Sequence, residues 1–308
     1  MWRFDSSQAH HICKNLAETC IGNRPGDGRN LGESMPIDYY GFLGKDIEQF
    51  KKEVFVKHKE VFAFFEEFNH FLQEMKFNLR VKDFDAWRIT IVALFIKSLE
   101  TFQSIYVLVT HCLSIDAENL TRVLFEAMVK IGYCSKGKSE FKRYTATHLH
   151  NIKKIINAAE NNQSEFPKEL FERKPLNLIK KEIDDMLDTE GNPKEITIES
   201  MAREIEIIKL YNSYYRSVCT SVHSAPKSLE KYVITGKNGE IEKFTWGPRM
   251  EGIIMHLFTA IEFMLLICKF LSGLFGVPME RDISDFNMRK DKLVKKYPVE
   301  SQEQSSTL

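Results

Sequence analysis

The chain has 308 residues, enough to bury a substantial core as one large domain or two smaller ones. Apolar residues make up 43% and charged residues 28%, a globular composition that excludes a disordered or fibrous chain. The 43 basic side chains equal the 43 acidic ones, so contact with nucleic acid would require a local basic patch, because a global positive field is absent.

The N-terminal third predicts a flexible lead-in followed by helices. Glycine and proline recur in "GNRPGDGRNLGESMP", and we expect residues 1–36 to form the lead-in. From Lys45 to about Asn78, apolar residues recur at helical steps. Asp83 is placed to cap the longest run, Phe84 to Cys112, which is apolar on more than one face and predicts the central helix of a bundle.

Further helices are predicted in the middle of the chain. Ser114 begins a helix through "NLTRVLFEAMVKIGY", with acidic residues in its first turn. More polar outer helices are expected over Lys138–Asn161 and Lys168–Leu187. The stretches "TIESMAREIEII" and "KLYNSYYRSVCTSVHS" then predict a short helix and a longer one before Pro226.

The pattern changes after Pro226. Two β-prone runs flank Asn238-Gly239 in "KYVITGKNGEIEKFTW", which predicts a small hairpin near residues 231–246. The apolar run Ile253–Val277 carries charges that would be expensive in lipid, so it predicts a buried core helix; a membrane span is the alternative. Residues 281–308 are charged, then polar, and are expected to form a flexible tail.

These patterns predict a mainly α protein, a bundle of about six to eight helices with one β-hairpin, folded as a single domain over residues 37–280. The six cysteines form no C-x-x-C pair and are expected to be reduced core residues. We expect no metal site and no cofactor, because the His and Cys spacings fit no standard ligand pattern.

The stretch "YYRSVCTSVHSAP" holds the strongest chemical signal. His223 follows Arg216 by seven positions, about two helical turns, so the two side chains share one stripe. Pro226 places His223 near the helix end, where unpaired carbonyls favour a protonated imidazole. A histidine that titrates near neutrality exchanges protons and an arginine holds phosphate, which together suit RNA cleavage without a metal.

This arrangement resembles the HEPN superfamily (higher eukaryotes and prokaryotes nucleotide-binding domains), in which an arginine precedes a histidine by a few residues and a polar residue such as Ser217 often follows the arginine. The resemblance implies a HEPN-like core at about 84–277 and a cytoplasmic, metal-independent endoribonuclease that acts as a homodimer on RNA. It also implies a toxin or phage-defence role, with an antitoxin or regulatory protein as a possible partner and no membrane partner.

The same arginine–histidine spacing occurs several times, so spacing alone does not select a site. The other pairs are Arg3/His10, Arg143/His148, Arg143/His150 and Arg249/His256. Only Arg216/His223 combines a polar neighbour with a histidine at a helix end. The chain is also similar to a mostly bacterial family of helical proteins of unknown function, through the blocks "AENLTRVLFEAMVKIGY" and "YYRSVCTSVHSAP".

Each candidate residue has a structural alternative. Arg216 and His223 form either a catalytic pair or a buried polar seam. Arg122 and Glu126 form either an ordinary i,i+4 ion pair or part of the substrate site, with Glu126 orienting Arg216 and Arg122 contacting phosphate. Tyr211, Tyr214 and Tyr215, which flank Arg216, either stack on bases or pack half-buried against the fold.

Two other functions remain open at this level. The first is a non-catalytic helical module that binds a protein or a nucleotide in the same groove. The second is a membrane-associated protein anchored through Ile253–Val277.

Overall fold

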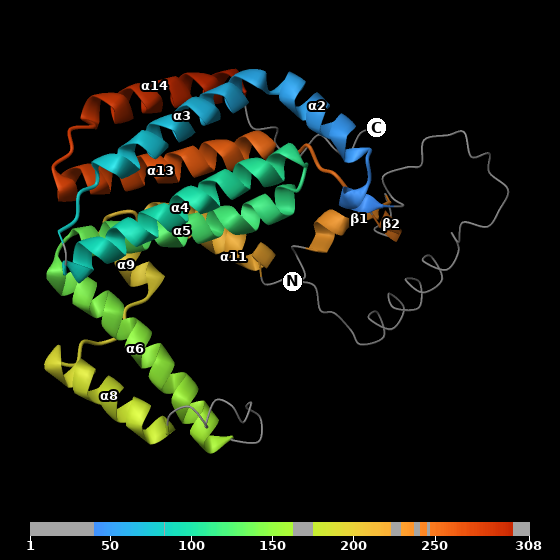
Figure 1. Ribbon diagram of the computed structural model, residues 1–308. Helices are drawn as coiled ribbons and strands as arrows, with labels where there is room; N and C mark the ends of the chain where they lie inside the picture. Colours follow the sequence, from blue (N-terminus) through green and yellow to red (C-terminus); the bar gives the residue numbers. More distant parts are fainter. Residues whose placement is uncertain are drawn as a thin grey trace.

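The molecule is a helical bundle from which a two-helix arm extends (Figure 1). The computed structural model describes residues 40–82, 84–162, 175–222, 229–236, 241–244 and 247–297. Its longer helices are α2 (Ile47–Lys57), α3 (Lys59–Asn78), α4 (Ala86–Thr110), α5 (Ser114–Ser135), α6 (Lys138–Asn161), α8 (Leu176–Thr189), α13 (Ile253–Phe275) and α14 (Glu280–Lys296). The shorter elements are η1 (Gly41–Leu43), α9 (Ile198–Glu204), α10 (Ile208–Leu210), the π-helical turn η3 (Tyr211–Tyr215), α11 (Arg216–Val222) and η4 (Glu230–Tyr232). The mainly α prediction is confirmed.

Three apolar helices, α4, α5 and α13, pack together at the centre of the bundle. α3 and α14 lie on one side of α13, and α9 to α11 cover α5 on the opposite side (Figure 1). Aromatic rings fill much of the interior: Phe65 of α3 stacks on Phe102 of α4 with ring centroids 3.9 Å apart. Burial of such rings is the main favourable contribution to folding.

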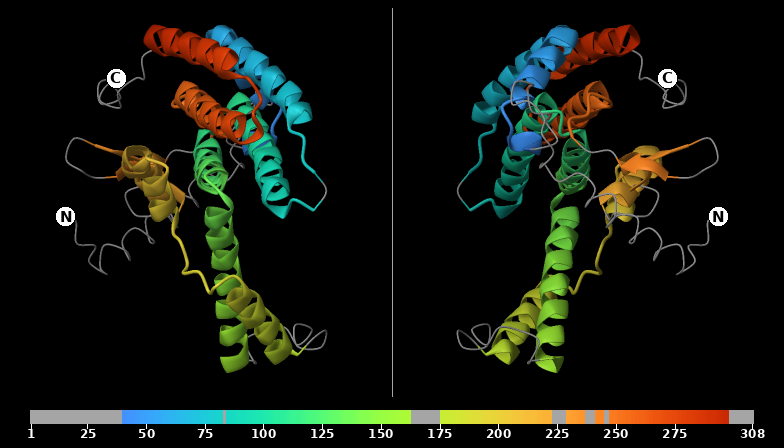
Figure 2. Two further views of the ribbon diagram at one scale, coloured as in Figure 1. Left: turned by 90° about the vertical axis from the view of Figure 1, so that its left-hand side faces the viewer. Right: turned by 90° about the vertical axis from the view of Figure 1, so that its right-hand side faces the viewer.

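The arm consists of α6 and α8, which leave the bundle together (Figure 2). A small apolar cluster separate from the main core joins the two helices, with Ile156 of α6 and Ile183 of α8 among its buried members. Lys180 of α8 and Glu160 of α6 add an ion pair of 3.1 Å. The arm therefore has a second, smaller core of its own.

Two boundaries differ from the expected ones. The helix expected over Lys45–Asn78 divides at His58, whose backbone leaves helical geometry. The expected cap Asp83 lies outside the described residues, and Asp85 caps α4 by accepting a hydrogen bond from the Arg88 backbone N–H at 3.2 Å. A second acidic residue two positions on satisfied the same capping pattern, which sequence alone does not resolve.

Two short strands, β1 (Val233–Thr235) and β2 (Ile241–Phe244), form an antiparallel pair in which Val233 lies opposite Phe244. An irregularity interrupts the register between Ile234 and Thr235. The Asn238-Gly239 turn expected between the strands lies outside the described residues. The hairpin as a whole therefore stays a prediction.

The expectation of a flexible tail from residue 281 is wrong for its first half. α14 occupies this segment and packs on α13 and α3. Phe286 is buried against Phe64, Phe68 and Phe71, with its ring centroid 4.9 Å from that of Phe68. Sparse apolar residues at helical steps are enough to dock a highly charged helix once α3 presents aromatic rings to it.

α4 and α13 are each long and apolar enough to cross a membrane by length and composition. Core helices of soluble proteins pass the same test, so the observation is weak evidence for a span. In this fold α13 is packed among α3, α4, α5 and α14, as expected of a core helix.

We expect Phe286→Ala to lower the free energy of unfolding by about 3 kcal/mol, because it removes a buried ring and leaves a cavity between α14 and α3. Met288→Ala is the matched control, since Met288 lies on the exposed side of the same helix. Urea denaturation of both variants measures the difference. Equal, small losses would show that α14 does not dock through Phe286.

Candidate functional site

Arg216 is the first residue of α11 and directly follows the π-helical turn η3. Its side chain is 58% exposed, and its guanidinium lies 3.3 Å from the carboxylate of Glu199 on α9. The guanidinium also lies over the ring of Tyr211, 5.6 Å from the centroid. Arg216 is therefore a surface residue held in place by a carboxylate and a ring, and it is not part of a buried seam.

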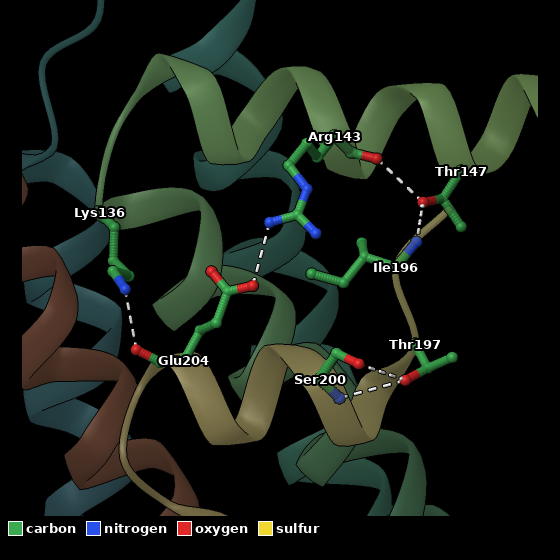
Figure 3. A network of polar contacts seen from close by, with 7 residues as sticks. All are labelled: Lys136, Arg143, Thr147, Ile196, Thr197, Ser200 and Glu204. Atoms are coloured by element: carbon green, nitrogen blue, oxygen red, sulfur yellow. Dashed lines mark hydrogen bonds and ion pairs between the residues drawn. The ribbon is translucent and has the colours of Figure 1, made fainter. Parts of the chain in front are cut away.

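Glu199 is positioned because α9 is tied to α6 by a polar network (Figure 3). Arg143 of α6 pairs with Glu204 of α9 at 3.0 Å, and the Lys136 ammonium donates to the Glu204 backbone carbonyl at 2.8 Å. At the other end of α9, the backbone N–H of Ile196 donates to the Thr147 hydroxyl at 2.9 Å. Glu199 thus approaches Arg216 from a helix that is held at both ends.

The start of α9 is also capped. The Thr197 hydroxyl accepts a hydrogen bond from the Ser200 backbone N–H at 3.1 Å (Figure 3). Within α9, Arg203 pairs with Glu199 at 3.1 Å. The two oxygens of Glu199 are thereby shared between Arg203 and Arg216.

A second polar group lies deeper, between α5 and η3. The Tyr215 hydroxyl donates to Glu126 at 2.8 Å, and Glu126 also pairs with Arg122 at 3.3 Å and Lys130 at 3.5 Å. Tyr215 is 8% exposed, and burial, followed by its bond to Glu126, raises its pKa above the usual value for tyrosine. The bond with Tyr215 raises the pKa of Arg122, whose Nε is buried without a hydrogen-bond partner in the described part of the chain.

Aromatic rings connect the two polar groups. Tyr211 stacks on Tyr215 at 5.0 Å, and Tyr215 stacks in turn on Phe125 of α5 at 5.2 Å. Arg216 lies over Tyr211, and Arg122 lies over Tyr215 at 5.4 Å. Both arginines are therefore held by rings of the same stack.

The structure groups Arg122, Glu126 and Tyr215 in direct contact but places Arg216 elsewhere. The functional interpretation in which Glu126 orients Arg216 is wrong, because Arg216 pairs with Glu199 and Glu126 binds Tyr215. Ser217 is exposed on α11. His223 lies outside the described residues.

The described members of the other arginine–histidine pairs lie in other surroundings. Arg143 pairs with Glu204 and not with a histidine. His150, in the middle of α6, is within hydrogen-bonding distance, 2.9 Å, of the Pro193 carbonyl. His256 is buried at the start of α13. The contacts of Arg143 and His150 are consistent with structural roles for these two residues.

Sequence reasoning missed Glu199, and it singled out Tyr211 without placing it against the Arg216 guanidinium. Glu199 forms an i,i+4 pair with Arg203, which is a common pattern on an exposed helix and carries no sign of a distant partner. Tyr211 lies five residues before Arg216, a spacing that a regular α-helix would not align. The π-helical turn between them changes the alignment.

Residues 88–241 match the model of the Family of unknown function (DUF5677). The match covers half of the chain. The chain belongs to this family. The region that matches DUF5677 runs from the start of α4 to the first residue of β2. It includes α5, which carries Arg122 and Glu126, and α11, which begins with Arg216. No curated protein and no solved structure matches the chain.

The expected kinship with an all-helical family of unknown function is thus confirmed, and the HEPN resemblance stays a prediction. In the described ranges, no three His, Cys, Asp or Glu side chains gather in a way that would hold a metal ion.

We expect Tyr215→Phe to lower the free energy of unfolding by about 1 kcal/mol, because Glu126 loses a hydrogen bond from a buried hydroxyl. Tyr211→Phe is the control, since Tyr211 stacks on the same ring and its hydroxyl donates to no group in the described part of the chain. Chemical denaturation compares them. If both variants lose the same stability, the hydroxyl of Tyr215 contributes nothing to the fold.

Stability should also fall in mild acid because of His256. Burial, aided by Lys231, lowers its pKa from 6.5 to about 4. Since the unfolded chain binds the proton first, stability present above about pH 6.5 is lost as pH falls towards 4, by about 3 kcal/mol at most. His256→Leu should weaken this pH dependence and the exposed His148→Leu should not, as measured by urea denaturation across that range. An unchanged profile in His256→Leu would contradict the assignment.

Proposed function

We propose that this protein is a metal-independent endoribonuclease in which Arg216 binds the scissile phosphate and His223 transfers protons. The observation that carries the proposal is the position of Arg216: largely exposed, supported by Tyr211, and seven residues before His223. An exposed guanidinium that already binds a carboxylate has the geometry and charge to bind a phosphate oxygen pair.

The chemistry requires little beyond these two groups. The ribose 2′-oxygen loses its proton to a base and attacks phosphorus, and the bond from phosphorus to the 5′-oxygen breaks. The leaving 5′-oxygen takes a proton from an acid, and the products are a cyclic 2′,3′-phosphate and a free 5′-hydroxyl. Arg216 would stabilise the charge on the phosphoryl oxygens.

A homodimer suits this chemistry, because two copies of His223 would supply the base and the acid separately. We propose this assembly, a cytoplasmic setting and a toxin or phage-defence role, with an antitoxin or regulatory partner, on the strength of the HEPN resemblance. In this scheme Glu199 occupies the phosphate position until RNA replaces it.

The second candidate is a non-catalytic module that binds a protein or a nucleotide in the same place. The observation that favours it is the Glu199–Arg216 ion pair, which partly neutralises the arginine that catalysis would use. An acidic segment of a partner protein would compete with Glu199 through the same chemistry.

The test is cleavage of total RNA and transfer RNA by the purified protein in the presence of EDTA. His223→Ala and Arg216→Ala should each reduce cleavage by about 10²–10⁴-fold, because each removes a proton-transfer or charge-stabilising group. Arg203→Ala is the matched control, since Arg203 binds the other oxygen of the same carboxylate.

Thermal melts separate catalysis from folding. Unchanged melting with lost cleavage assigns the pair to catalysis. Absence of cleavage by every form of the protein, with a much lower melting temperature for His223→Ala, would contradict the nuclease and favour the binding module.

A further inference from the structure

The turn that joins α3 to α4 exposes large apolar side chains. We call residues 76–82 and 84–89 the α3–α4 corner; it lies at an end of the bundle (Figures 1 and 2). Phe77 is 77% exposed and Phe84 is 100% exposed. Rings of this size are usually buried on folding, so two exposed rings in one short segment indicate a surface that contacts something else.

Phe84 has an unusual backbone conformation, and the residues that follow it are anchored. Phe84 has a φ of 66°, in the left-handed region that non-glycine residues rarely adopt. The residues after it are anchored, because Asp85 caps α4 and the Trp87 indole N–H donates to the Cys134 carbonyl at 2.8 Å. A backbone in this region is strained, and the fully exposed Phe84 ring buries no surface in this chain that would offset the strain. Strained residues of this kind often occur at functional sites.

Basic residues lie close to the two rings in the chain. The Lys76 ammonium lies 4.9 Å from the centroid of the Phe77 ring. Arg80 and Lys82 are exposed and make no ion pair with any described residue. The nearby carboxylate of Asp85 is already used by Arg88, at 3.2 Å. In the sequence, four basic residues of this segment outnumber its two acidic ones, Asp83 and Asp85, so the segment carries net positive charge beside exposed aromatic rings.

The helix that follows, α4, also exposes aliphatic side chains. Ile89 is 47% exposed, and Ile96, seven residues later on the same helical face, is 46% exposed. This part of the surface is aliphatic, and aliphatic side chains do not stack on nucleic-acid bases as aromatic rings do.

We propose that the α3–α4 corner attaches the protein to the surface of a membrane that contains anionic lipids. Phe77 and Phe84 enter the boundary between head groups and acyl chains, while Arg80 and Lys82 contact the anionic head groups. A lipid surface accepts both the aromatic rings and the aliphatic face of α4, whereas single-stranded RNA would use only the rings and the cations. This departs from the expectation of no membrane partner, because the exposure of these rings became visible only in the folded chain.

The test is cosedimentation of the full chain with vesicles of phosphatidylcholine alone and of phosphatidylcholine mixed with phosphatidylserine. The wild type should bind the mixed vesicles more tightly. Phe84→Ser should weaken that binding by about tenfold or more, through the lost apolar burial. The double variant Arg80→Glu/Lys82→Glu should lose a similar factor or more and should lose the preference for anionic lipid.

Matched controls lie on α2, where Val56 is 79% exposed and Lys52 is also exposed. Val56→Ser and Lys52→Glu should leave vesicle binding unchanged, and circular dichroism should show that all variants fold. No vesicle binding by the wild type, or equal losses in the corner and control variants, would overturn the proposal.

A labelled oligouridylate distinguishes the competing ligand. If Phe84→Ser weakens oligouridylate binding and leaves vesicle binding unchanged, the corner is an RNA surface and the membrane proposal is wrong. RNA cleavage in solution should be the same for Phe84→Ser and the wild type, so the outcome is independent of the nuclease test.

Discussion

The burial of α5 on several sides is the constraint on which the rest of the structure depends. α4, α13, α6, α9 and α11 all pack against this helix. Its close packing is clearest at Gly132, where an added Cβ would lie 2.6 Å from the Phe270 ring and 2.9 Å from the side chain of Ile205. Only glycine allows these neighbours to approach. A helix so enclosed has little access to water, so its polar groups are costly to bury unless they find partners on the elements that cover it.

That requirement explains the tyrosines before Arg216. Arg122 and Glu126 face η3, and the Tyr215 hydroxyl donates a hydrogen bond to the Glu126 carboxylate. Tyr214, the preceding residue, bonds to Thr121 on the same helix. Two consecutive tyrosines of the π-helical turn thus contact α5. Arg216 then emerges on the outer side, towards α9.

The family match and the core do not coincide. Residues 88–241 contain α4 to α11, yet α13 lies beyond them and packs against both α4 and α5. In this chain the matched region therefore depends on a later helix to complete its core. The candidate site is different, because the described residues that form it, from Arg122 to Arg216, all lie within the match.

The sequence by itself determined the helical class, most helix positions and the contact between Arg122 and Glu126. These follow from local periodicity, capping residues and i,i+4 spacing, which act within one helix. Only the tertiary structure decided that Arg216 pairs with Glu199, that Tyr215 is buried, that α14 docks through Phe286 and that Phe84 is exposed. Each depends on which distant helix lies alongside, and a periodic pattern shows that a face is buried without showing against what it packs.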